Sequence, residues 1–266
     1  MELPIAAAAG DSGSRHRAAG VDQDGMVAEL DQAQQDLTKQ WPGTSAPLIA
    51  GLAAAAGAAV AAGALADLGS LAAPSAAVAG MADAISGAMT DLAAVSAGRA
   101  AAEVATQGVT AEAGTPDSGR ISGIAETTAA LLAAGFASSA ARTALLYAGP
   151  VATRAGVVRA VRDGLNELAD PSGAGFVAST LSSALVSAQH EGRMATFASV
   201  KDRGLRFVAI EANHEKACGP CREVDGREFR SLAAAAAAYP TGKYVHCLGR
   251  QRCKGTVYAV AGSSRK

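Results

Sequence analysis

Aromatic residues are scarce in this chain of 266 residues, at 4%, and there is a single tryptophan. Half of the residues are hydrophobic, but much of that half is alanine. Alanine buries little area per residue, so the composition disfavours a thick globular core. It favours long, closely packed helices instead, because alanine has the highest helix propensity.

Cysteine is absent from residues 1–217, and no signal peptide is apparent at the start. Glu2 follows Met1, and the apolar run at residues 6–9 is too short for a signal-peptide core. We therefore expect a reducing compartment, the cytoplasm of the producing cell. There, four clustered thiols favour metal binding, with two disulfides as the alternative if the chain is exported by another route.

Sequence motifs of the common enzyme classes are also missing. The chain has no P-loop, no G-x-G-x-x-G, no G-x-S-x-G and no H-E-x-x-H. The zinc deaminase pattern fails, because no H-x-E precedes the cysteines. These absences favour a structural or binding role over an enzyme, and a zinc-dependent enzyme stays open as the alternative.

Charge is divided unevenly along the chain. Residues 1–200 hold 10 Lys/Arg against 18 Asp/Glu, a net charge of −8, whereas residues 201–266 hold 13 against 6, a net charge of +7. The division suggests two modules with different partners. The alternative is a pair of oppositely charged surfaces that only keep the protein soluble.

The predicted fold class is mainly α with a small α+β module at the C-terminus. We expect a flexible arm over residues 1–25, an elongated Ala-rich helical region over residues 26–200, and a zinc-stabilised module over residues 201–262. The first helix is predicted over residues 26–40, ending at Trp41-Pro42-Gly43 because proline disfavours helix in the residue before it.

Residues 48–66 carry no charge and are long enough to span a membrane. They hold few strongly apolar residues and lack flanking Lys/Arg clusters, so we interpret them as a buried helix of small residues and expect no membrane partner.

Further helices are predicted at residues 76–108, 121–147 and 151–168. In the second of them, Leu131, Leu132, Phe136 and Leu145 are the expected anchors. Asp170-Pro171 predicts the start of the next helix, as an N-cap followed by proline. Its apolar stripe is Val177, Leu181, Leu185, Ala188 and Gly192.

The composition of the sequence changes after Lys201. Residues 206–212 and 256–260 are rich in β-branched and aromatic side chains and predict strands. Asp225-Gly226 is typical of a hairpin turn. Ser231 can cap a short alanine helix over residues 232–238.

The four cysteines, Cys218, Cys221, Cys247 and Cys253, fall within this module as two pairs. Tetrahedral zinc takes four such donors, and two separated pairs supply them by closing a loop. The second pair is less regular than C-x2-C, so His246 could replace one cysteine. We predict one structural Zn²⁺ whose binding energy stabilises a small core.

Basic residues surround the predicted site, with aromatic residues between them, and could contact the phosphates of a nucleic acid. A solvated positive surface is the alternative. The residues are Arg222, Arg227, Arg230, Lys243, Arg250, Arg252 and Lys254.

Three segments together resemble the C-terminal domain of the phage Mu F-like minor head proteins, a family of head morphogenesis proteins. They read E-A-N-H-E-K-A-C-G-P-C-R-E-V-D-G-R-E-F, A-Y-P-T-G-K-Y-V-H-C and R-C-K-G-T-V. The resemblance covers about residues 195–260, and a stretch like residues 188–193 (AQHEGR) precedes it in the family. The matching positions are Cys218, Cys221, Asp225, Gly226, Pro240, His246, Cys247 and Cys253. Many members close with H-P-x-C-R-C, whereas no proline follows His246 here.

This resemblance implies a minor component of the procapsid interior, made in the bacterial cytoplasm and present as a homo-oligomer or in several copies of an assembly. Its implied partners are the portal and the capsid or scaffold proteins, together with packaged DNA. Some related proteins are capsid maturation proteases or carry fused toxins, which is the origin of the enzyme alternative.

Overall fold

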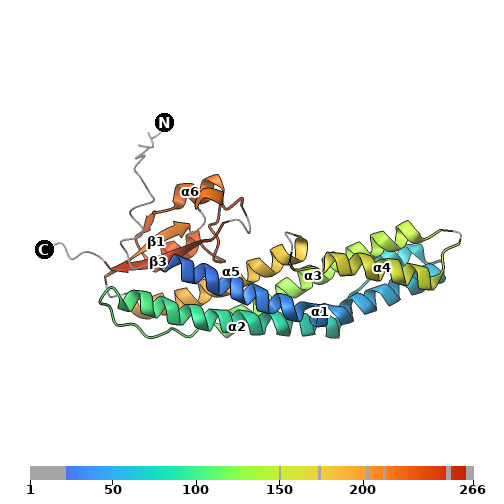
Figure 1. Cartoon of the computed structure of the whole chain (residues 1–266), viewed down its shortest axis with the longest axis horizontal. Coiled ribbons are helices and arrows are strands. Elements are labelled where there is room, and N and C mark those ends of the chain that lie inside the picture. Colours follow the sequence, from blue (N-terminus) through green and yellow to red (C-terminus); the bar gives the residue numbers. More distant parts are fainter. Residues whose placement is uncertain are drawn as a thin grey trace.

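The computed structural model shows a long helical bundle with a small α+β module at one end (Figure 1). Helices make up most of the chain, and the strands form one three-stranded antiparallel sheet near the C-terminus. Both features agree with the predictions made from the Ala-rich composition and from its change after Lys201. The structure describes residues 22–149, 151–172, 175–201, 204–211, 214–249 and 253–261.

Helix α1 (Gln23–Ala61) is longer than predicted and carries both Pro42 and Pro47 in its interior. The prediction that it ends at Trp41-Pro42-Gly43 is therefore wrong. A proline inside a helix costs about 3 kcal/mol. Large apolar side chains on both sides of Pro42, such as Trp41 and Leu48, are fully buried, and their burial offsets that cost.

The start of α1 also overlaps the predicted arm, since residues 23–25 are helical and Asp22 caps them by accepting the N–H of Gly25 at 2.8 Å. The rest of the arm lies outside the described residues.

The other long helices fall close to their predicted positions: α2 (Ser75–Ala105), α3 (Ser118–Tyr147), α4 (Arg154–Leu168) and α5 (Phe176–Val200). A short 3-10 helix, η2 (Leu65–Ser70), joins α1 to α2. The predicted cap at Asp170-Pro171 is wrong, because α5 begins only at Phe176. Asp170 instead accepts bonds from the N–H and the hydroxyl of Ser172 in a local turn.

The helical core is continuous from Leu30 of α1 to Ala188 of α5 and contains many alanines. The predicted stripe of α5 is buried along its whole length. Of the four expected anchors of α3, Leu132 and Phe136 are buried, but Leu131 and Leu145 are about half exposed. That part of the prediction is wrong because neighbouring helices cover only one face of α3.

The C-terminal module is built on strands β1 (Leu205–Glu211), β2 (Glu228–Phe229) and β3 (Gly255–Ala261), in the order β2-β1-β3. Between β1 and β2 lie a 3-10 turn, η3 (His214–Lys216), and helix α6 (Gly219–Val224). Asp225-Gly226 does form a turn, with Gly226 at φ 79°, but it joins α6 to β2 and not two strands. Helix α7 (Leu232–Ala238) begins where Ser231 accepts the N–H of Ala234, as predicted.

Both faces of the sheet are covered by the long helices. One face, with Phe207 and Val257, packs with Ala100 and Val104 of α2 and Phe197 of α5. The opposite face, with Ile210 and Tyr258, packs against Met26 of α1. The module therefore shares its core with the bundle end on which it sits.

A run of polar residues fastens α5 to its neighbours. Gln189 donates to the carbonyl oxygen of Met26 at 2.8 Å, and Glu191 pairs with Arg120 of α3 at 3.0 Å. Arg193 is 1% exposed, pairs with Glu103 of α2 at 2.7 Å and lies over the ring of Tyr258. Removing one partner of a buried ion pair of this kind is strongly destabilising, because the other charge is left buried and uncompensated.

By length and composition alone, three segments are long and apolar enough to cross a membrane: Gln23–Ala61, Leu65–Ala105 and Ser118–Tyr147. The absence of a membrane partner stays a prediction from the sequence.

Candidate metal centre

Four thiols converge in the C-terminal module. The Sγ atoms of Cys218, Cys221, Cys247 and Cys253 all lie within 4.8 Å of one another. The first pair lies at the start of α6, Cys247 lies in the loop after α7, and Cys253 lies two residues before β3. Segments 26 to 35 residues apart in sequence thus meet at one point.

Local structure explains how the first pair is directed inward. Cys218 is the N-cap of α6, and Pro220 occupies the first turn, where its missing N–H has no helical partner to lose. Cys221 then lies on the buried side of that turn. The N–H of Cys218 approaches Cys253 Sγ at 3.4 Å, and the N–H of Leu248 approaches Cys218 Sγ at 3.3 Å. Backbone donors of this kind stabilise thiolates.

Gly249 lies against the sulfur cluster. A Cβ atom built there would fall well inside van der Waals contact of Cys253 Sγ and 3.3 Å from Cys218 Cβ. The position therefore requires glycine for space, a role that the sequence pattern did not reveal.

The thiols differ in acidity. Burial raises the pKa of Cys218, but the N–H groups of Cys221 and Leu248 and the neighbouring thiols outweigh it and lower the pKa to about 6. Burial raises the pKa of Cys253 to about 11 and that of Cys221 still further. A divalent cation removes such differences, because it displaces the protons of all the thiols that bind it.

The donor set fits a tetrahedral metal ion. Zinc–thiolate bonds of about 2.3 Å place the sulfurs of a tetrahedron about 3.8 Å apart, and the observed spread is compatible with a small contraction around an ion. All four cysteines are free thiols, so the alternative of two disulfides is not what the structure adopts. The cluster can therefore hold a metal.

His246 does not belong to this set of donors. Its side chain is exposed, and its ring packs edge-on against Tyr244 at 5.3 Å between centroids. The four cysteines are thus sufficient for tetrahedral coordination without the predicted substitute.

The predicted basic residues divide into two groups. Arg222, Arg227 and Arg230 are exposed on the surface of the module. Lys243 is half-buried and donates to Ser183 Oγ at 2.8 Å, while Lys254 lies 3.9 Å from Asp31 of α1. Arg250 and Arg252 lie outside the described residues.

A surface hollow of about 420 Å³ lies beside the cysteines. Glu223, Arg227, Tyr244 and His246 are among the residues that line it. Because four sulfurs are sufficient for tetrahedral coordination, none of these side chains is needed as a ligand.

Comparisons of the chain with protein-family models, with curated proteins and with solved structures found no match. The resemblance to the Mu F-like minor head proteins stays a prediction from the motifs.

Proposed function

We propose that this protein is a minor head protein of a tailed phage or prophage, with a structural role in head morphogenesis. It acts inside the procapsid, in contact with the portal and with capsid or scaffold proteins. The observation that carries the proposal is the convergence of Cys218, Cys221, Cys247 and Cys253 on one point, within the segment whose motifs resemble that family. A helical bundle bearing such a module suits an assembly component.

We infer that the bound ion is Zn²⁺ and that it is structural. Four thiolates are the ligand set of closed zinc sites, whereas a catalytic zinc keeps one position for water. The alternative of a capsid maturation protease or a nuclease-like effector requires such an open position. A complete set of four protein ligands therefore favours the structural role.

The exposed arginines of the module are suited to packaged DNA. Arg222, Arg227 and Arg230 can reach phosphates without breaking an ion pair among the described residues. Contacts of this kind carry no sequence information and weaken steeply as salt rises.

The proposed role is tested in the host. Procapsids isolated after prophage induction, and analysed by mass spectrometry, are expected to contain this chain in far fewer copies than the major capsid protein, together with the portal. Recovery of the chain only from the soluble fraction, free of procapsids, would contradict the role.

Metal content is tested on the purified protein. Cys218→Ser removes one of four thiolates and is expected to reduce bound zinc from one per chain to a small fraction, because the remaining three cysteines leave the sphere incomplete. The measurement is inductively coupled plasma mass spectrometry after dialysis. His246→Ala is the matched control and should keep one zinc per chain. Loss of zinc in His246→Ala would show that the histidine is a ligand.

A further inference from the structure

One end of the helical bundle exposes apolar side chains. Leu146 is 79% exposed and Val151 is 92% exposed, and Leu145 and Tyr147 beside them are more than half exposed. These four residues, here called the tip, lie in the last turn of α3 and in the connection that follows it to α4. Figure 1 shows that connection at the end of the bundle opposite the C-terminal module. Apolar side chains gathered in this way mark interaction surfaces.

The tip is flanked in sequence by positive charge. No aspartate or glutamate occurs between Glu126 and Asp163, a stretch that holds four arginines. Three of them, Arg142, Arg154 and Arg159, are exposed and near the tip in sequence. None of these three forms an ion pair with a described residue. The tip is therefore apolar, and exposed arginines precede and follow it in the sequence.

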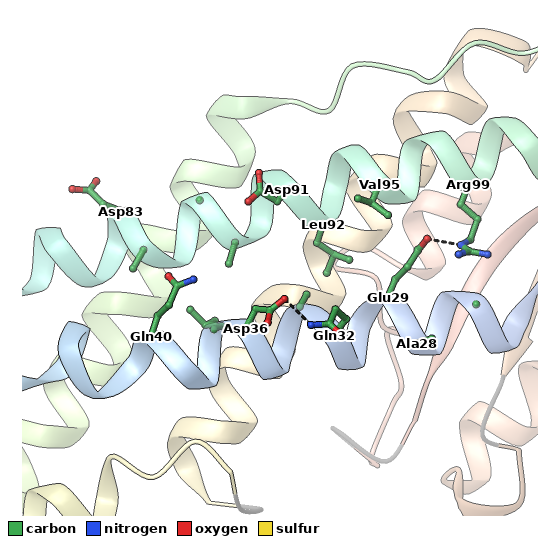
Figure 2. Close-up of a pocket in the computed structure, with 16 residues that line it drawn as sticks. Ala28, Glu29, Gln32, Asp36, Gln40, Asp83, Asp91, Leu92, Val95 and Arg99 are labelled. Carbon is green, nitrogen blue, oxygen red and sulfur yellow. Dashed lines mark hydrogen bonds and ion pairs between the residues drawn. The ribbon is translucent and has the colours of Figure 1, made fainter.

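A groove of about 690 Å³ between α1 and α2 has the opposite character. Its floor is formed by small and apolar residues, among them Leu37, Ala88 and Leu92, and Val95 is half exposed within it. Figure 2 shows carboxylates of both helices along its length.

Two of these carboxylates have no cation beside them. Arg99 binds Glu29, and Lys39 binds Asp36, so those two are neutralised. Asp83 and Asp91 are exposed and form no ion pair with a described residue. The groove is therefore apolar with an acidic rim on the α2 side.

We propose that the tip of one molecule docks into the α1–α2 groove of a second copy of this chain. The apolar side chains supply the attraction, and the arginines of the tip meet the free carboxylates of the groove. The groove follows α1 from Gly25 to Gln40, about 22 Å at 1.5 Å per residue. Two packed helices about 8–10 Å apart end at the tip, so the groove is long enough to receive it.

The contact joins different molecules, because the tip lies at the far end of the bundle from the part of α1 and α2 that forms the groove (Figure 1). It pairs two different surfaces, so one molecule can offer its tip while its own groove receives another. The inference is independent of the proposed function and of the metal.

The test uses the full chain in sedimentation velocity over a range of concentrations up to about 100 µM, where a contact of modest affinity is populated. A tip variant carries Leu146→Asp and Val151→Asp, and a groove variant carries Asp83→Lys and Asp91→Lys. All four positions are exposed, so folding should be unaffected. A control variant carries Leu131→Asp and Glu126→Lys, at exposed positions of α3 outside both surfaces.

The wild type and the control should self-associate, and each of the two test variants alone should associate at least tenfold more weakly. An equimolar mixture should form dimers and nothing larger, because one intact groove of the tip variant meets one intact tip of the groove variant. Raising the salt concentration should weaken association.

A monomeric wild type at the highest concentration, or a tip variant that associates as the wild type does, would overturn the proposal. So would a mixture of the two variants that stays monomeric. Vesicles of phosphatidylcholine and phosphatidylglycerol provide the remaining arm. Binding of the wild type to them that the tip variant loses, with self-association unchanged in that variant, would assign the tip to a lipid surface instead.

Discussion

The cysteine cluster leaves no space for a side chain at Gly249. Gly249→Ala would place a methyl group against Cys253 Sγ and Cys218 Cβ. We expect the variant to bind zinc at least tenfold more weakly, because the sulfurs must move off a tetrahedron to make room. The measurement is a competition titration against a chromophoric zinc chelator.

Gly219 supplies the matched control for that variant. It lies between the cysteines of the first pair, yet a Cβ atom added there meets nothing within 4 Å. Gly219→Ala should therefore bind zinc as the wild type does. Equal weakening by both substitutions would mean that backbone flexibility near the cysteines matters, and not the space beside Gly249.

The buried imidazole of His190 predicts a dependence of stability on pH. Burial, reinforced by the charges of Arg120 and Arg193, lowers its pKa from 6.5 to about 3. Below pH 6.5 the imidazole binds a proton in the unfolded chain but not in the folded chain. The free energy of unfolding therefore falls as the pH drops towards 3. At pH 5 the loss relative to pH 7 is about 2 kcal/mol.

Urea unfolding of the wild type and of His190→Gln, followed by circular dichroism between pH 5 and 7, measures this effect. Glutamine has no titrating group, so the variant should lack about 2 kcal/mol of the pH-dependent loss, whatever its stability at pH 7. His246→Gln, at an exposed site, is the control and should keep the full dependence. Identical slopes in the wild type and His190→Gln would contradict the lowered pKa.

Sequence spacing was sufficient to predict the sulfur cluster, because C-x2-C and a later pair of cysteines leave few ways to bind a metal. The role of Gly249 was not predictable, since it depends on how closely the loop after α7 approaches the first pair. His190 could only be judged isolated in the sequence. Its burial depends on α5 being covered by other elements, and no periodic pattern reports that.

At the scale of elements, helix positions were largely predictable from composition, but boundaries set by local signals were not. Pro42 and Asp170-Pro171 carry strong local preferences, and the structure overrides both. In α1 the apolar residues on both sides of Pro42 must face one core, which only a continuous helix allows. Tertiary burial of side chains such as Trp41 outweighs the local cost of the proline.

The crossing of α2 and α5 depends on a glycine. A Cβ atom on Gly192 would overlap the carbonyl group of Ala93, which is backbone and cannot turn away. Gly192→Ala should therefore push the helices apart and destabilise the protein by about 1–3 kcal/mol, the usual cost of overpacking. Thermal and urea unfolding measure the change.

Gly98 of α2 is the matched control for the helix crossing. It is exposed, and an added Cβ there meets nothing within 4 Å. Gly98→Ala should stabilise the protein by about 0.5–1 kcal/mol, because alanine loses less backbone entropy on forming a helix. A stabilising Gly192→Ala would show that the two helices can separate at no cost.

At the scale of the whole molecule, the boundary predicted at residues 200 and 201 divides the chain where the fold changes but not where contacts end. Helices α2 and α5 pack on one face of the sheet, and α1 packs on the other. Among the described residues, by contrast, the main helical core contains none beyond Ala188. The main helical core therefore forms without the module, whereas the module and the bundle end beside it share their core.

Removal of the metal should separate the two parts. The only tryptophan, Trp41, is fully buried in the helical core, whereas three of the four tyrosines, Tyr239, Tyr244 and Tyr258, lie in the module. Because zinc binding energy in small sites is folding energy, a strong chelator should abolish the near-ultraviolet tyrosine signal of the module. The emission maximum of Trp41 and most of the helical circular dichroism should persist, since the helical core has lost no contact of its own.

Readdition of zinc should restore the tyrosine signal. A shift of Trp41 emission at the same chelator concentration as the tyrosine change would mean that bundle and module unfold as one cooperative unit, and that the polar run from Gln189 to Arg193 transmits the loss of the metal into the helices.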